Sequence, residues 1–134
     1  MSDINCLSGG CLCGYMRYEV RAAPVMAGYC HCRSCQRLTG APVMVWAQIP
    51  IKAFSYLSGE PAVYQSSETG ERRFCPRCGG QLEFRRRPDP KTIELMVATL
   101  DDPSRMPPQV HIFTESRIPW FETTDSLPRL LQMT

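Results

Sequence analysis

The chain lacks several features that would define its cellular setting. None of its apolar runs approaches the ~20 residues that a membrane-spanning helix needs, and residues 1–10 lack the basic and apolar regions of a signal peptide. Basic runs are missing apart from residues 85–87, a pattern typical of a solvated strand end, and the net charge is only +2. These absences predict a cytoplasmic protein with no membrane partner, and they argue against a nucleic-acid partner.

Long helical periodicities are also scarce, because 12 prolines and nine glycines interrupt the 134 residues. Residues 15–21 alternate, with Met16, Tyr18 and Val20 on one face, as in a half-buried strand. One short helix is predicted over residues 34–39, capped by Ser34 and ended by Gly40. Further strands are predicted at residues 25–30, 42–49, 54–57, 62–66, 72–74, 81–86, 93–99 and 110–114. The sequence therefore predicts a mainly β single domain over residues 9–128, with tails at residues 1–8 and 129–134.

The chain has eight cysteines, an unusual number for its length. In a cytoplasmic protein they are more often metal ligands than disulfides, because that compartment keeps thiols reduced. Cys75 and Cys78, followed by Gly79, form the CxxCG pattern of a zinc knuckle, whose turn favours glycine. A knuckle supplies two ligands, and Cys11 and Cys13 are the natural complement. These four cysteines predict a structural zinc that staples segments about sixty residues apart.

Cys30, Cys32 and Cys35 remain for a second site, with three thiols inside six positions. Three thiolates and an exchangeable fourth position are typical of a reactive zinc site. Three alternatives stay open: buried free thiols, Cys6 as a fourth ligand, and iron or an iron–sulfur centre, whose common spacings differ from CxCxxC. His31 is predicted to lie beside the site or on the surface rather than to bind the metal.

Four segments, in this order, resemble the glutathione-dependent formaldehyde-activating enzyme family, which includes the centromere-protein-V-like proteins. They are Cys11-x-Cys13, CHCRSCQRLTGAP at residues 30–42, FCPRCGGQL at residues 74–82 and HIFTESRIPWFETTDSLP at residues 111–128. The resemblance implies a zinc-stapled fold of the β-tent (Mss-four-like) type. It also implies two zinc ions per chain: a structural one on the four cysteines and a catalytic-type one on the three, the second bound more weakly because it has fewer ligands.

The resemblance further implies an activity. The family's named reaction adds glutathione to formaldehyde and gives S-hydroxymethylglutathione, which is carbon–sulfur lyase chemistry. A small thiol such as glutathione would then be the substrate and partner. Because glutathione carries a net negative charge, Arg33 and Arg37 beside the cluster are candidate partners for its carboxylates. Arg72 and Arg73, which precede the knuckle, are candidates for the same role.

Other functions remain open at this point. A non-catalytic zinc-binding β-tent module for protein or nucleic-acid interaction predicts a closed second site, whereas an enzyme predicts an open site that faces a pocket. A weak or redox-labile zinc store is a third hypothesis. In the C-terminal segment, Trp120 is predicted to plug the core. His111 is predicted to lie near one metal site or to be a hydrogen-bonded core histidine.

Overall fold

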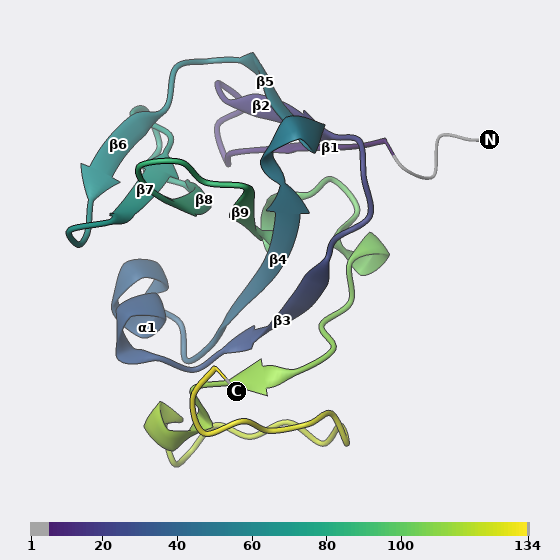
Figure 1. Ribbon diagram of the computed structural model, residues 1–134, viewed down its shortest axis with the longest axis vertical. Coiled ribbons are helices and arrows are strands. Elements are labelled where there is room, and N and C mark those ends of the chain that lie inside the picture. Colours follow the sequence, from purple (N-terminus) through teal and green to yellow (C-terminus); the bar gives the residue numbers. More distant parts are fainter. Residues whose placement is uncertain (1–5, 134) are drawn as a thin grey trace.

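The computed structural model describes residues 6–133 and consists mainly of short β-strands (Figure 1). The strands are β1 (Leu7–Gly10), β2 (Arg17–Val20), β3 (Met26–Cys30), β4 (Met44–Pro50), β5 (Phe54–Ser58), β6 (Ala62–Gln65), β7 (Gly70–Phe74), β8 (Gln81–Arg86), β9 (Thr92–Met96) and β10 (His111–Ile112). The helical segments are α1 (Arg33–Thr39) and the 3₁₀ turns η2 (Ile51–Ala53), η3 (Val97–Thr99), η4 (Pro103–Arg105) and η5 (Thr114–Ser116). The predicted mainly β architecture with little helix is confirmed.

The strands form two sheets. The larger sheet has seven strands in the order β10-β3-β4-β9-β8-β7-β6, and the smaller has three in the order β1-β2-β5. Neighbouring strands are antiparallel except for β10, which lies parallel to β3. The described part of the chain contains no helix long and apolar enough to span a membrane.

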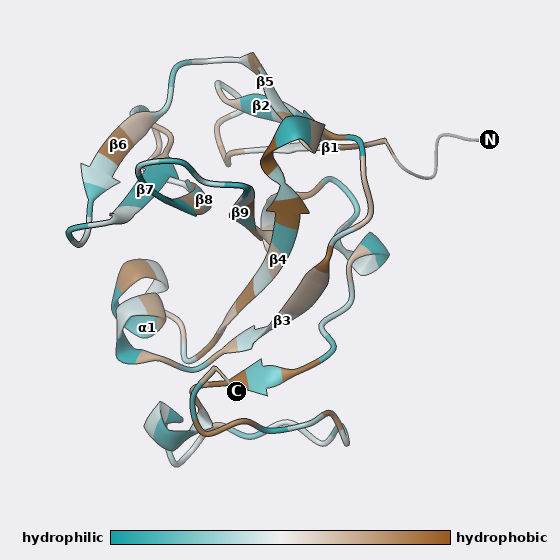
Figure 2. Ribbon diagram, viewed as in Figure 1, coloured by the Kyte–Doolittle hydropathy of each residue, from teal (hydrophilic) through white to brown (hydrophobic). Residues whose placement is uncertain are grey.

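The main core lies between the small sheet and one face of the large sheet. Met16, Tyr18 and Val20 are fully buried there, which confirms the alternation predicted for β2. From the large sheet, Ile93 and Leu95 of β9 enter the same core. In Figure 2, β4 is hydrophobic along much of its length, as expected for a strand in the middle of a sheet, whereas β7 is mainly hydrophilic.

Some predicted element boundaries are wrong. Helix α1 begins at Arg33, and its N-terminal cap is Cys32 rather than Ser34, because the Cys32 Sγ accepts a hydrogen bond from the Cys35 backbone N–H. Gly40 ends the helix as predicted, with φ of 68°. The predicted strand 93–99 stops at Met96 and turns into η3, and the predicted strand 110–114 is only two residues long.

Strand β1 was not predicted. Its antiparallel pairing with β2 begins at Leu7, within the segment expected to be an N-terminal tail. At the other end of the chain, residues 128–132 lie beside β10, where the Leu130 N–H donates to the His111 carbonyl and the Phe113 N–H donates to the Gln132 carbonyl, both at 2.9 Å. The ordered fold therefore reaches into both predicted tails.

The second face of the large sheet carries a row of polar and aromatic side chains. One row of paired residues crosses five strands of this sheet, and paired residues in antiparallel strands share a face. From β4 to β6 the row consists of Gln48, Glu94, Phe84, Arg72 and Tyr64. Helix α1 lies beside the β3–β4 ribbon, on the side toward β6, β7 and β8 (Figure 1). The large sheet therefore has one face that closes the core and one that faces α1.

Candidate metal centres and the adjoining cavity

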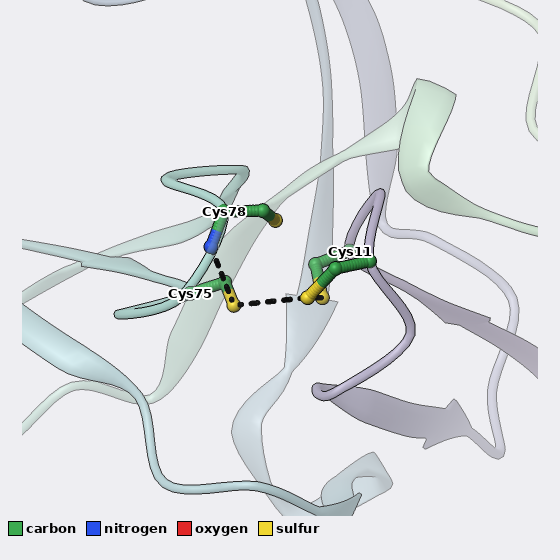
Figure 3. Close-up of side chains that lie close together, drawn as sticks. Cys11, Cys75 and Cys78 are labelled. Atoms are coloured by element: carbon green, nitrogen blue, oxygen red, sulfur yellow. Dashed lines mark hydrogen bonds between the residues drawn. The ribbon is translucent and has the colours of Figure 1, made fainter.

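The first cysteine group joins two turns that are far apart in the sequence. The Sγ atoms of Cys11, Cys13, Cys75 and Cys78 all lie within 4.8 Å of one another, and Figure 3 shows the labelled side chains gathered between the two turns. The Sγ of Cys13 lies 3.6 Å from that of Cys11 and 3.8 Å from that of Cys75. Tetrahedral zinc with bonds of about 2.3 Å places its sulfur ligands about 3.8 Å apart. The spacing of this group therefore fits a four-coordinate metal.

Backbone N–H groups support the same group of sulfurs. The Met16 N–H donates to the Cys11 Sγ at 3.2 Å, and the Arg77 N–H donates to the Cys75 Sγ at 3.3 Å. Both turns pass through a glycine in the left-handed region, Gly14 with φ of 84° and Gly79 with φ of 79°. A larger residue would be strained there, which is why each cysteine pair is followed by glycine.

The second cysteine group lies where β3 leads into α1. Cys30 ends β3, Cys32 caps α1, and Cys35 lies in its first turn. The Cys30 Sγ lies 3.3 Å from that of Cys32 and 3.2 Å from that of Cys35. In the part of the chain that the structure describes, no fourth His, Cys, Asp or Glu ligand atom joins this group. Cys6 is exposed and belongs to neither group.

Ionisation of the second group is uneven. Hydrogen bonding from Cys30 lowers the pKa of Cys32, whereas the contact with Cys32 raises the pKa of Cys30. Contacts with Cys30 and Cys32 also raise the pKa of Cys35. Crowded sulfurs therefore hold one negative charge more easily than three. Three thiolates would be stable together only beside a compensating cation, so the donor set fits a bound metal ion.

The three cysteines open into a cavity of about 240 Å³. Its floor is the α1-facing side of the large sheet, and its wall includes the start of α1. Apolar lining comes from Met44, Trp46, Phe84, Ile112, Phe113 and Met133. Polar and charged lining comes from Ser34, Gln48, Arg72, Arg86 and Glu94. The cavity therefore combines thiols, two guanidinium groups and one carboxyl group.

A more open hollow of about 480 Å³ continues from this cavity. The two share Ser34, Arg72, Phe84 and Arg86, so the arginines stand at the junction. The guanidinium carbons of Arg72 and Arg86 lie 4.5 and 5.0 Å from the centre of the Phe84 ring. Contacts of this kind hold a guanidinium over an aromatic face, and the Arg72 Nε–H also donates a hydrogen bond to the Ser66 Oγ at 3.2 Å. The outer hollow adds Arg37, Leu38, Tyr64, Ser66 and Ser67.

Comparison with known proteins agrees with this geometry. The family model described as glutathione-dependent formaldehyde-activating enzyme matches residues 6–116, a span that contains both cysteine groups. The chain belongs to this family.

Two relatives illustrate the similarity. A Halomonas elongata protein whose name assigns it to glutathione-dependent formaldehyde activation is 26% identical over 125 residues, which cover 87% of this chain and 80% of the relative. The crystal structure of a Rhodobacter sphaeroides protein superimposes with a TM-score of 0.59 at 25% identity, covering 71% of this chain and 88% of that one.

The predicted arginines occupy different places in this family member. Arg37 borders the outer hollow, and Arg72 borders both the hollow and the cavity. Arg33 does not line either one; it donates to the Gln36 Oε1 at 2.5 Å and lies near Trp120 on another surface. Arg73 pairs with Glu71 and borders neither.

Arg86 was missed by the sequence interpretation, which placed residues 85–87 at a solvated strand end. The sequence did contain a signal that Arg86 shares a face with the aromatic side chain of Phe84. Phe84 and Arg86 are two residues apart in a strand and therefore lie on the same face, while Arg85 faces the other way and binds Glu83.

The two histidines form a buried pair. His31 is 1% exposed, so of its two predicted positions the surface one is wrong, and its Nε2 lies 2.8 Å from the His111 Nδ1. The His111 Nε2 lies 3.1 Å from the Asp125 Oδ1, which confirms a hydrogen-bonded core histidine. Trp120 is 76% exposed, so the prediction of a core plug is also wrong.

Proposed function

We propose that the protein is a zinc-dependent enzyme of the carbon–sulfur lyase type that joins the thiol of glutathione to formaldehyde or a similar small aldehyde. One observation supports this most strongly: the three-cysteine group has no fourth ligand among residues 6–133 and faces a charged cavity. A closed second site would instead have favoured a module that only binds a partner. The family membership and the name of the Halomonas elongata relative point to the same reaction.

The proposed metal content is two zinc ions per chain. Cys11, Cys13, Cys75 and Cys78 would hold the structural ion, while Cys30, Cys32 and Cys35 would hold a more easily lost one. A zinc ion bound by three thiolates would lower the pKa of a substrate thiol at its fourth coordination position, so that the sulfur attacks as a thiolate. We place this reaction in the cytoplasm, where thiols stay reduced.

The residues around the cavity would orient the substrate. Glutathione has two carboxylates distant from its thiol, and Arg72 and Arg86 stand between the cysteines and the outer hollow. Guanidinium groups bind carboxylates with paired hydrogen bonds, so these two arginines would hold one carboxylate while the thiol reaches the cysteines. Arg37 would bind the other carboxylate in the outer hollow, beside Ser66 and Ser67. Trp46 and Phe84 would exclude water from the reacting sulfur.

Wild-type protein loaded with zinc is expected to speed formation of S-hydroxymethylglutathione from glutathione and formaldehyde. The reaction should be followed by NMR, with the spontaneous rate recorded in the same buffer without protein. The Cys35→Ser protein provides the matched control, because it keeps the four-cysteine group but loses one cysteine of the proposed centre. A rate equal to the spontaneous one over a range of small aldehydes would remove the proposed enzyme function.

Arg86→Ala is expected to raise the KM for glutathione by about 10- to 100-fold, because a charge-assisted hydrogen bond contributes about 1.5–3 kcal/mol. The KM for the neutral thiol 2-mercaptoethanol should change little, since that substrate carries no carboxylate. Arg33→Ala is the control: Arg33 flanks the cysteines in sequence but does not line the cavity or its outer hollow. If Arg86→Ala and Arg33→Ala raised the KM for glutathione equally, Arg86 would not be a carboxylate-binding residue of this cavity.

A further inference from the structure

Glu94 is a carboxyl group of the cavity that the proposed substrate contacts do not use. It lies in the middle of β9, where Ile93 and Leu95 point into the core and are fully buried. Because side chains alternate along a strand, Glu94 faces the other way, toward α1. It pairs with Gln48 on one side and Phe84 on the other, and it lines the same cavity as the three cysteines.

No hydrogen bond or ion pair engages the Glu94 carboxyl group within residues 6–133. The neighbouring acidic residue on β8 behaves differently. Glu83 faces the core, where it accepts hydrogen bonds from the Tyr56 hydroxyl at 2.7 Å and from both ends of the Arg85 guanidinium. A carboxyl group that serves the fold is thus fully paired in this sheet, whereas Glu94 is left available to whatever enters the cavity.

The surroundings of Glu94 favour its neutral form. Burial is the largest influence and raises the pKa of Glu94, while the positive charges of Arg86 and Arg72 oppose that rise in part. The Cys32 sulfur at the start of α1 adds to it. Two further cations, Arg85 and Lys91, line a third hollow, which Glu94 also lines. A raised pKa keeps more of a carboxyl group protonated at a given pH, so that it can donate a proton as well as accept one.

Two simpler roles fit less well. As a fourth metal ligand, Glu94 would have an oxygen within the cluster formed by Cys30, Cys32 and Cys35, but none belongs to that group. As a partner of the cavity arginines, it would lie within 4 Å of a guanidinium nitrogen, and no such ion pair exists in the described part of the chain. Among the described residues that line the cavity, Glu94 is the only carboxyl group, and none is a histidine, lysine or tyrosine.

We propose that Glu94 is the catalytic residue that carries the proton in this reaction, a role that rests on the proposed function. As the thiolate sulfur forms its bond to the aldehyde carbon, the electron pair of the C=O π bond moves to the oxygen. The neutral Glu94 carboxyl group donates its proton to that oxygen and becomes a carboxylate. The carboxylate then takes the proton of the next entering thiol. Over one cycle, a thiol and an aldehyde combine into a hemithioacetal, such as S-hydroxymethylglutathione, and no oxidant or reductant is required.

The test is Glu94→Gln, which keeps the shape of the side chain and removes its ability to exchange a proton. The expected result is a fall in kcat of about 10²- to 10⁴-fold. Zinc content and thermal midpoint should stay at wild-type values. Glutathione affinity should also persist, and it can be read from the fluorescence of Trp46, which lines the cavity, in a Trp120→Phe background. Glu60→Gln, in an exposed turn, is the matched control.

A second readout separates proton transfer from a structural effect. The kcat of the wild type should fall as pH rises through the pKa of Glu94, because the proton-donating form is lost, and Glu94→Gln should lack that fall. A wild-type protein that does not exceed the spontaneous rate would overturn the proposed function and this role with it. If the wild type is active and Glu94→Gln matches it, or if Glu94→Gln loses zinc, only the role of Glu94 is wrong.

Discussion

Cys11→Ser is expected to leave the purified protein largely unfolded. A four-cysteine zinc contributes on the order of 10 kcal/mol of binding free energy that is coupled to folding, which is comparable with the whole stability of about 5–15 kcal/mol of a typical domain. The four cysteines come from the turn between β1 and β2 and the turn between β7 and β8. Losing one ligand would release the two sheets from each other at that point. Circular dichroism during thermal unfolding, with metal analysis of the same sample, measures the effect.

Leu12→Ser is the matched control for this experiment. Leu12 stands between two of the ligands but is 93% exposed, so its loss removes no buried contact and no sulfur. The control should keep its zinc and unfold within a few degrees of the wild type, as surface substitutions usually change stability by less than about 0.5 kcal/mol. A Cys11→Ser protein that melts together with the control would show that the four-cysteine group does not support the fold.

The four-cysteine group also supports the cavity. Cys75 and Cys78 lie in the connection between β7 and β8, and those two strands carry Arg72, Phe84 and Arg86. Fixing the connection fixes the hairpin, and with it the row of side chains that faces α1. The four-cysteine group and the three-cysteine group are therefore connected through the large sheet.

Local patterns were enough to predict most elements and both cysteine groups. A strand such as β2 can be predicted from the alternation of Met16, Tyr18 and Val20. This pattern of burial on one face is visible within a few neighbouring residues of the sequence. Cysteine spacing is informative for the same reason: ligands a few residues apart bind one metal only when a short turn brings them together. The β1 strand was not predicted, because Leu7–Gly10 contains two glycines and no alternating apolar pattern.

The lining of the cavity depended on information that local patterns do not contain. Arg72, Glu94 and Gln48 lie in one row because β7, β8, β9 and β4 pair in one particular register, and a shift of one residue would turn each of them to the other face. The same limit applies to Arg33, which is next to the ligands in sequence but points along a different side of α1. Sequence proximity to the cysteines was therefore a poor guide to the cavity, whereas strand register decides it.

Cys35→Ser is expected to have the second large effect, on metal and activity rather than on the fold. Cys35 is 5% exposed, and its Sγ lies 3.2 Å from that of Cys30, so it is an integral part of the three-cysteine group. Serine is a poor zinc ligand at neutral pH, and loss of even an outer contact of a metal site costs about 10–100-fold in affinity. The variant should hold one zinc per chain instead of two, and its rate should fall to the spontaneous level.

Cys6→Ser separates this effect from a general loss of thiols. Cys6 is exposed and lies outside both groups, so the control should keep both zinc ions and the full rate. The fold of Cys35→Ser should persist, because the four-cysteine group is untouched and the serine side chain is close in size to cysteine. Atomic emission analysis of zinc, circular dichroism and the NMR rate assay on the three proteins test each part. A Cys35→Ser protein with two tightly bound zinc ions would require a different ligand set, and one with a single zinc ion but full activity would place the chemistry elsewhere.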